Sequence, residues 1–336
     1  MNNDRFTYHL SRYMNLSWNL LKCRFATHTP VFLTHIATDF CNQRCQFCNV
    51  WVQQLEKDIQ KELKTGDVFD MLDKAHDAGM VSYTIWGGEP LLRPDMEEIL
   101  AYAHKKKFLI SMITNGYLLE KKAEMVGAYV DYLIVSIDAI GELHDELRGR
   151  KESFERAHRG IQKLKGKTRI ILNDVICNKN VNEIDKVIEY ARSMGASLTF
   201  EPVQRIHGFN DHLTLTPEQQ SVVFDHIYQQ KVRGNSIANS KYYFKAMTQP
   251  SSFTCHAPKM YITVNADGTI YSCKGRTWGN IREKTFLTAL RSDEYAQFTK
   301  ESEPCNECVV SCVIETSKAY DLHPAYYYDM TKSFFR

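Results

Sequence analysis

The chain has 336 residues, of which 43% are hydrophobic and 24% are charged, and its formal net charge is only +2. This size and composition suit one large domain with an appendage and allow a core that needs no disulfide bonds. The near-neutral charge gives no support for nucleic-acid binding. No apolar stretch reaches the roughly 18 residues of a membrane span and no secretory signal is recognisable, so we expect a cytoplasmic protein.

Residues 1–29 predict an amphipathic helix. Its apolar side chains share one face with cations at the boundary, namely Phe6, Leu10, Tyr13, Met14 and Leu21 with Arg5, Arg12, Lys22 and Arg24. Such a helix could pack across the bottom of a barrel or lie on a membrane surface, which would add a peripheral membrane association to the cytoplasmic location. So few residues precede the first predicted strand that we expect no peptide leader-binding module there.

Residues 30–213 alternate short apolar stretches with amphipathic ones, as successive parallel βαβ units do. We expect strands over 31–36, 83–86, 108–114, 132–136, 169–176 and 198–200, and helices over 68–78, 96–104, 119–126, 154–164 and 184–194. Right-handed crossovers would curl these strands into an α/β fold, a partial (β/α)6 TIM-like barrel that works at the carboxyl ends of its strands.

Residues 214–336 predict a small cysteine-rich α+β extension. Thr216 and Pro217 are typical of a helix start, and that helix continues to about residue 232. Farther on, alternating residues flank Asp267 and Gly268, a dipeptide that favours the turn of a β-hairpin.

The ten cysteines are unevenly distributed. Thiols stay reduced in the cytosol, so clustered cysteines indicate metal ligands or catalytic groups there. One group holds three members and another holds five, namely Cys41, Cys45 and Cys48, then Cys255, Cys273, Cys305, Cys308 and Cys312. Cys23 and Cys177 stand alone, and we expect both to be small buried hydrophobic residues.

The three-cysteine group suits an iron-sulfur cluster with an open position. Three thiolates hold three irons of a 4Fe-4S cubane and leave the fourth iron without a protein ligand. A zinc knuckle, or a closed ferredoxin-type cluster that borrows a distant cysteine, are the alternatives. Zinc fits poorly, because no fourth Cys or His follows at the usual spacing.

With this spacing, and with aromatic Phe47 before the last cysteine, the sequence resembles the radical S-adenosylmethionine (radical SAM) superfamily. Further motifs follow in register over roughly residues 30–205: WGGEP after the second strand, TNG after the third, VSIDAIGELHDELRG from the fourth, Asn173, and Glu201-Pro202. The resemblance implies an enzyme that reductively cleaves SAM to a 5'-deoxyadenosyl radical, which abstracts hydrogen from an unactivated C–H bond. It also implies a flavodoxin or ferredoxin-type electron donor and an oxidoreductase or transferase reaction.

The resemblance also implies the residues that bind SAM: Phe47, Gly87, Gly88, Glu89, Pro90, Thr114, Asn115, Ser136, Asp138, Arg148 and Asn173. Glu89 would accept from the methionine ammonium, Ser136 and Asp138 would approach the ribose, and Arg148 would pair with the carboxylate. A helix cap for Asp138 and a surface salt bridge for Arg148 are the alternative roles. Thr114, Asn115 and Asn173 could instead be ordinary turn residues.

The five-cysteine group resembles the auxiliary-cluster domains called twitch and SPASM. One auxiliary 4Fe-4S cluster for electron transfer would use four of the five thiols, either without Cys312 or with Cys312 and one of the preceding pair free. A structural zinc site is the alternative. Anaerobic sulfatase-maturating enzymes place an Asp base directly after the hairpin's second cysteine, where this chain has Lys274, so the candidate bases are Glu201, His256 and Tyr271.

The substrate stays open at this point. We expect a lipid or isoprenoid chain, with C–C bond formation or oxidation, because the N-terminal helix and the tail AYYYDMTKSFFR are aromatic and basic. The alternatives are a peptide-modifying maturase or a dehydrogenase of a small carbohydrate-like metabolite. If the protein is not an enzyme, the alternatives are an iron-sulfur electron carrier and a zinc-stabilised binding module.

Overall fold

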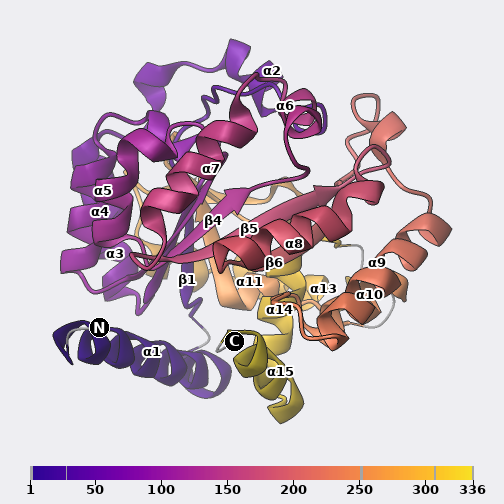
Figure 1. Cartoon of the computed structure of the whole chain (residues 1–336). Coiled ribbons are helices and arrows are strands. Elements are labelled where there is room, and N and C mark those ends of the chain that lie inside the picture. The colour runs from indigo at the N-terminus through magenta and orange to yellow at the C-terminus, as the bar shows by residue number, and fades with distance from the viewer. Residues whose placement is uncertain (1–2, 28, 250–252, 306–307, 335–336) are drawn as a thin grey trace.

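The computed structural model describes residues 3–27, 29–249, 253–305 and 308–334, and it is organised around one nine-stranded sheet (Figure 1). The strand order is β6-β5-β4-β3-β2-β1-β7-β8-β9. The first six strands in the chain are parallel neighbours, and β1 and β6 do not pair to close the sheet. The architecture is therefore the predicted partial barrel.

The strands lie within two residues of the predicted ranges. Their bounds are β1 Phe32–Ile36, β2 Ser82–Trp86, β3 Leu109–Thr114, β4 Tyr132–Ser136, β5 Arg169–Ile176 and β6 Ser197–Pro202. The crossover helices are α3 Thr65–Asp77, α4 Met96–Lys105, α5 Leu119–Tyr129, α7 Ser153–Leu164 and α8 Ile184–Met194. Two short helices that were not predicted, α2 Val50–Gln53 and α6 Glu142–Arg148, lie beyond the carboxyl ends of β1 and β4.

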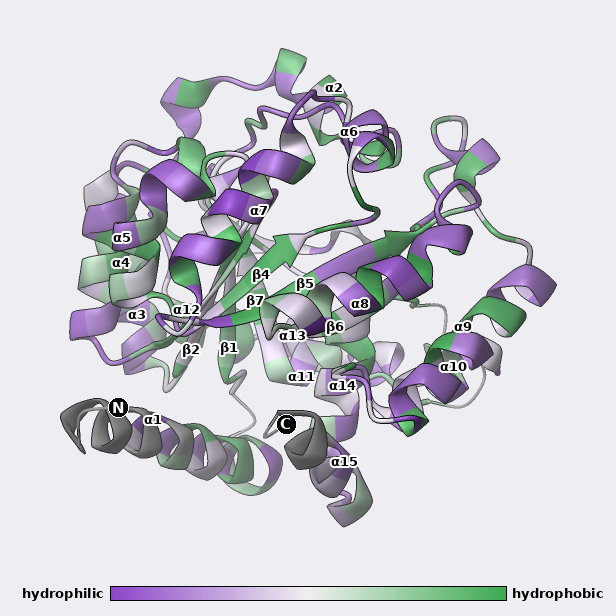
Figure 2. Ribbon diagram, viewed as in Figure 1, coloured by the Kyte–Doolittle hydropathy of each residue, from purple (hydrophilic) through white to green (hydrophobic). Residues whose placement is uncertain are grey.

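The crossover helices cover the sheet because each has one apolar face. In α3 the buried side chains are Val68, Met71, Leu72 and Ala75, which recur at helical spacing. Figure 2 shows the same division, with hydrophobic residues on the central strands and hydrophilic residues on the outer surfaces of the helices. The buried residues of strands and crossover helices belong to one continuous core.

The C-terminal part extends the barrel sheet, which the sequence did not indicate. The predicted hairpin is present as β7 Tyr261–Val264 and β8 Thr269–Tyr271, and β9 Thr277–Asn280 adds a third strand. β7 pairs with β1 in parallel, from Phe32 opposite Tyr261 to His35 opposite Val264. The helices of this part are α9 Pro217–Val232, α10 Lys241–Thr248, α11 Ala257–Met260, α12 Phe286–Leu290, α13 Asp293–Ser302, α14 Ser311–Tyr320 and α15 Pro324–Phe334.

Helix α1, Asn3–Lys22, continues as a π-helical turn, Cys23–Thr27, and packs across the end of the barrel away from α2 and α6 (Figure 1). Arg12 was expected at a polar boundary, but it is buried and both of its terminal nitrogens donate to the Asp131 carboxylate, which neutralises its charge. The side chains of Arg5, Phe6, Leu10 and Tyr13 lie outside those that the structure describes. Within the described ranges, no helix has the length and apolar character needed to cross a membrane.

Candidate functional site

The three-cysteine loop follows β1 and is held by backbone hydrogen bonds on two sides. On one side the amides of Gly88 and Glu89, which follow β2, donate to Thr38 O and Phe40 O at 2.8 Å each. On the other side the loop amides of Arg44 and Gln46 donate to the carbonyl oxygens of Arg148 at 3.1 Å and Leu147 at 2.9 Å. The loop is therefore fixed between the GGEP segment and the end of α6.

Two glycines permit this close approach. A Cβ atom on Gly88 would lie 2.0 Å from Phe40 O, and one on Gly149 would lie 2.3 Å from Arg44 O. Gly149 also ends α6 in the left-handed region, with φ +61°. Side chains at these positions would push the cysteine loop away, so both glycines are needed for loop packing in addition to any contact with a ligand.

The three thiols lie close enough for their charges to interact. Burial raises the pKa of the Cys45 thiol to about 12, and the neighbouring thiols of Cys48 and Cys41 add to that effect, whereas Arg148 opposes it. Burial also raises the pKa of Cys41. Among the described residues, no three His, Cys, Asp or Glu side chains form a site for a single metal ion. Three neighbouring thiols from one loop fit the ligand set of a cluster with one open iron.

The two isolated cysteines, Cys23 and Cys177, are fully buried, as the sequence predicted.

Glu89 is buried beneath this loop and held by three donors. Its Oε1 accepts from the Thr114 hydroxyl at 2.7 Å and from Leu91 N at 3.1 Å, and its Oε2 accepts from Asn115 N at 2.8 Å. Burial raises the pKa of Glu89 to about 6, against the lowering effect of the Asn115 and Thr114 hydrogen bonds. Asn115 also places its Nδ2 3.8 Å from Cys41 Sγ, so Glu89, Thr114, Asn115 and Cys41 form one cluster of side chains.

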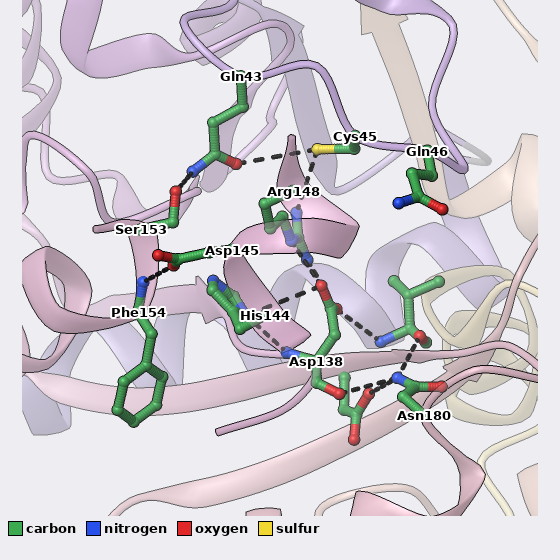
Figure 3. Close-up of polar contacts among 12 residues, drawn as sticks. Gln43, Cys45, Gln46, Asp138, His144, Asp145, Arg148, Ser153, Phe154 and Asn180 are labelled. Carbon is green, nitrogen blue, oxygen red and sulfur yellow. Dashed lines mark hydrogen bonds and ion pairs between the residues drawn. The ribbon is translucent and has the colours of Figure 1, made fainter. Parts of the chain in front are cut away.

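Arg148 and Asp138 form a buried ion pair against the same loop (Figure 3). Arg148 Nε and Nη2 donate to the two Asp138 carboxylate oxygens at 2.6 and 2.7 Å, and Arg148 Nη1 lies 4.0 Å from Cys45 Sγ. Asp138 Oδ1 also accepts from Val175 N at 3.1 Å, and Asn180 Nδ2 donates to Asp138 O at 2.8 Å. Arg148 is only 6% exposed, so the surface salt bridge considered for it is wrong.

The remaining predicted SAM residues surround these two clusters. Phe47 is buried under Arg148, whose guanidinium carbon lies 5.1 Å from the ring centroid. Ser136 and Asn173 are opposite one another on β4 and β5, and Asn173 Oδ1 accepts from the Thr199 hydroxyl at 2.9 Å. Gly87 has a backbone φ of +132°, and Pro90 is the first residue of a short 3-10 turn, Pro90–Leu92.

Four polar residues that support the loop were missed by the sequence reasoning. Gln54 Oε1 accepts from Cys41 N, and Glu62 Oε1 accepts from Thr38 Oγ1 and Asp39 N, each at 2.8 Å. Arg93 Nη1 donates to Ala37 O at 2.8 Å, and Gln43 Nε2 donates to the Ser153 hydroxyl at 2.9 Å. Gln54, Glu62 and Arg93 lie outside every motif, and Gln43 lies at a position of the three-cysteine motif whose residue type the spacing does not specify, so the sequence held no signal for them.

The five-cysteine group is assembled from the segment before α11, the 3-10 turn after β8, the loop before α14 and the first turn of α14. Burial raises the pKa of Cys308 to about 11, and Cys255, Cys273 and Cys305 raise it further. Cys312 is exposed on the first turn of α14. Cys312 also lies close enough to Cys308 for the two thiols to interact, so all five thiols belong to one group and both predicted four-thiol sets fit it.

The three candidate bases lie at this second group. Glu201 Oε1 accepts from Ser311 N at 3.0 Å and from the Ser311 hydroxyl, which joins the end of β6 to the start of α14. His256 Nε2 lies 3.3 Å from Asp321 Oδ1, and Tyr271 is opposite Thr263 in the hairpin. The side chain of Lys274 lies outside those that the structure describes.

Two family models match the chain. Residues 35–191 match the radical SAM superfamily, and residues 255–309 match the iron-sulfur cluster-binding domain SPASM. These matches agree with the predicted cofactors, which are a 4Fe-4S cluster, SAM and an auxiliary iron-sulfur cluster.

Three curated relatives are 25–33% identical to the chain over the aligned residues. It is 27% identical to mycofactocin maturase MftC of Mycolicibacterium smegmatis over 73% of this chain and 64% of that protein. It is 33% identical to the AdoMet-dependent heme synthase of Methanosarcina barkeri over 51% of this chain and 49% of that protein. The probable GTP 3',8-cyclase of Methanococcus maripaludis is 25% identical over 70% of this chain and 82% of that protein. The matched part thus spans less than two thirds of the first two relatives.

Solved structures support the fold. SuiB of Streptococcus suis bound to precursor peptide SuiA superposes with a TM-score of 0.66 at 17% identity, over 89% of this chain and 72% of that chain. Native anSMEcpe with bound AdoMet superposes with a TM-score of 0.65 at 21% identity, over 90% of this chain and 95% of that chain. Both superpositions therefore cover most of the fold described above.

Proposed function

Since the chain is a radical SAM enzyme with a SPASM-type C-terminal domain, we propose that it reductively cleaves SAM and thereby abstracts hydrogen from an unactivated C–H bond of its substrate. One observation supports this most strongly: the loop of Cys41, Cys45 and Cys48 is fixed directly against the GGEP segment and the buried Glu89. An open-iron ligand set and a carboxylate for the methionine ammonium thus share one site. The SAM-binding roles of individual residues are part of the proposal.

Within this proposal, the protein's own residues bind and orient. When bound, the cluster supplies the electron that cleaves the carbon-sulfur bond of SAM. Glu89, with its pKa of about 6, is mostly ionised at neutral pH and can accept from an ammonium group. Thr114 and Asn115 hold that carboxylate in place. Ser136 is the last residue of β4 and Asn173 lies opposite it on β5, so both offer polar groups where ribose hydroxyls could be bound.

Arg148 takes a different role from the one first expected. Its guanidinium is committed to both oxygens of Asp138 and lies beside Cys45 and Phe47. We assign it to positioning of the cysteine loop, and Asp138 to positioning of Arg148. The ligand's carboxylate would then be bound by other groups.

The auxiliary cluster would carry electrons. We take Cys255, Cys273, Cys305 and Cys308 as its ligands and Cys312 as the spare thiol, and full ligation by protein favours electron transfer over direct substrate binding. A flavodoxin or ferredoxin-type protein is the proposed donor of the first electron.

Two substrate classes remain in the proposal. A lipid or isoprenoid chain is supported by the apolar surface of α1, and a peptide is supported by the sequence similarity to a maturase. Anaerobic assays with lipid extracts and with peptides encoded by neighbouring genes would separate them, because only the true substrate should increase 5'-deoxyadenosine formation and change in mass.

The chemistry itself is tested without a substrate. Reconstituted protein with dithionite and SAM should form 5'-deoxyadenosine, detected by mass spectrometry, and Cys45→Ala should form none. The matched control is Cys23→Ala, which removes a buried thiol outside both cysteine groups. Absence of 5'-deoxyadenosine from the fully reconstituted wild type would leave an iron-sulfur electron carrier as the better interpretation.

A further inference from the structure

The outer face of α1 and the following π-helical turn carries four large apolar side chains in contact with solvent. Met14 is 65% exposed, Trp18 57%, Leu21 42% and Phe25 71%. Their spacings of four, three and four residues place them along one side of the helix. We call these four residues the outer face of α1.

The opposite side of α1 is firmly attached to the protein. Leu16 and Leu20 pack with buried Cys23 against a cluster that includes Met260 and Tyr320. The buried pair between Arg12 and Asp131 adds a second attachment, to the barrel. Because these contacts fix the rotation of the helix, the outer face of α1 stays turned toward solvent.

The charge of this segment selects the kind of surface that would cover it. Residues 5–38 contain no Asp or Glu. Lys22 and Arg24 are exposed on this segment. Lys22 Nζ lies 5.4 Å from the Trp18 ring centroid, and the Arg24 guanidinium carbon lies 5.6 Å from the Phe25 ring centroid and 4.8 Å from that of Tyr320. Aromatic rings bordered by cations suit the boundary between anionic headgroups and acyl chains.

A second copy of the chain fits this face less well. A symmetric dimer would place the same patch against itself, so Lys22 and Arg24 of each copy would face a segment that supplies no carboxylate. A lipid surface provides the missing negative charge.

We propose that the outer face of α1 docks the protein on an anionic membrane surface, with Trp18 and Phe25 in the headgroup boundary and Lys22 and Arg24 against lipid phosphates. Helix α1 lies at the end of the barrel away from α2, which directly follows the cysteine loop (Figure 1). Docking therefore leaves the cysteine loop facing away from the bilayer. The surface recruits the enzyme to a membrane whatever its substrate is.

Vesicle flotation of the full-length reconstituted enzyme tests this. Vesicles of phosphatidylcholine with about one third phosphatidylglycerol should carry the wild type upward, and pure phosphatidylcholine vesicles should not. Trp18→Ser/Phe25→Ser and Lys22→Glu/Arg24→Glu should each lower the ratio of bound to free protein at least tenfold. Val222→Ser/Val232→Ser, which removes two exposed apolar side chains from α9, is the matched control and should bind like the wild type.

Formation of 5'-deoxyadenosine by every variant at the wild-type rate shows that folding and cluster assembly are intact, and it separates this proposal from the proposed chemistry. The proposal is overturned if the wild type does not float with anionic vesicles, or if the α9 variant loses binding as much as the α1 variants do. It is also overturned if the wild type is a dimer that Trp18→Ser/Phe25→Ser converts to a monomer, because a second copy would then cover this face.

Discussion

Substitution of Gly88 by alanine tests the idea that close backbone packing positions the cysteine loop. The added Cβ would lie 2.0 Å from Phe40 O and 2.4 Å from Phe40 C, which are backbone atoms that cannot rotate away. The two segments must separate, and that breaks the 2.8 Å bonds from Gly88 N to Thr38 O and from Glu89 N to Phe40 O. Two backbone hydrogen bonds at about 1 kcal/mol each give a loss of about 2 kcal/mol.

If that loss falls on the arrangement that binds SAM, the Kd for SAM should rise about 30-fold, since 1.4 kcal/mol corresponds to a factor of ten. Equilibrium binding of SAM to the anaerobically reconstituted protein measures this, together with iron content. Gly66→Ala is the control, because a Cβ on Gly66 in α3 meets nothing within 4 Å and should only improve helix propensity, by up to about 1 kcal/mol. A Gly88→Ala protein with wild-type SAM affinity and iron content would refute the reasoning.

Two further predictions concern the C-terminal part. Cys308→Ala should lower the iron content by about four atoms per chain, whereas Cys312→Ala should keep it; the opposite result would show that Cys312 is a ligand. Burial raises the pKa of Glu315 to about 7, so between its ordinary value and pH 7 the folded state keeps a proton that the unfolded chain has released, and the free energy of unfolding falls as the pH rises. Glu315→Gln retains an acceptor for Ser240 N and should remove this fall, gaining about 2–3 kcal/mol relative to wild type between pH 5 and pH 8 in urea unfolding. The control Glu98→Gln, at an exposed position, should leave this pH dependence as in the wild type. An unchanged pH dependence in Glu315→Gln would contradict the raised pKa of Glu315 as its cause.

The alternation of apolar and amphipathic segments was enough to predict the six barrel strands, because each buried strand and each one-sided helix has its own sequence period. The same pattern could not show that β7 pairs with β1. That pairing joins Phe32 to Tyr261, residues far apart in the chain, and depends only on which sheet edge the extension meets. Helix α6 was missed because its residues lie inside a motif that was interpreted through its chemistry.

The candidate site was predictable where function depends on residue type and adjacency, as for Cys41, Cys45, Cys48 and Glu89. The pairing of Arg148 with Asp138 was not predictable, because either charged side chain could equally bind a ligand. Only the fold of α6 brings Arg148 Nε within 2.6 Å of an Asp138 carboxylate oxygen. A bidentate pair buried to this extent stabilises one arrangement of the loop, since removing either partner would leave an unpaired charge in the interior.

The register between β1 and β7 gives a reason for the two cysteine groups to have different roles. The three-cysteine loop follows the last residue of β1, whereas Tyr261 pairs with Phe32, the first residue of β1. Burial and the nearby thiols of Cys312, Cys308, Cys273 and Cys255 raise the pKa of Tyr261 well above its usual value, so the second group lies around this residue. On β1 itself, four steps of about 3.3 Å, or ~13 Å, lie between Phe32 and the residue that precedes the three-cysteine loop. Thiols gathered around Tyr261 therefore approach β1 at the end opposite the three-cysteine loop, an arrangement suited to a second cluster that exchanges electrons with the first. The sheet register thus favours a conducting role for the auxiliary cluster.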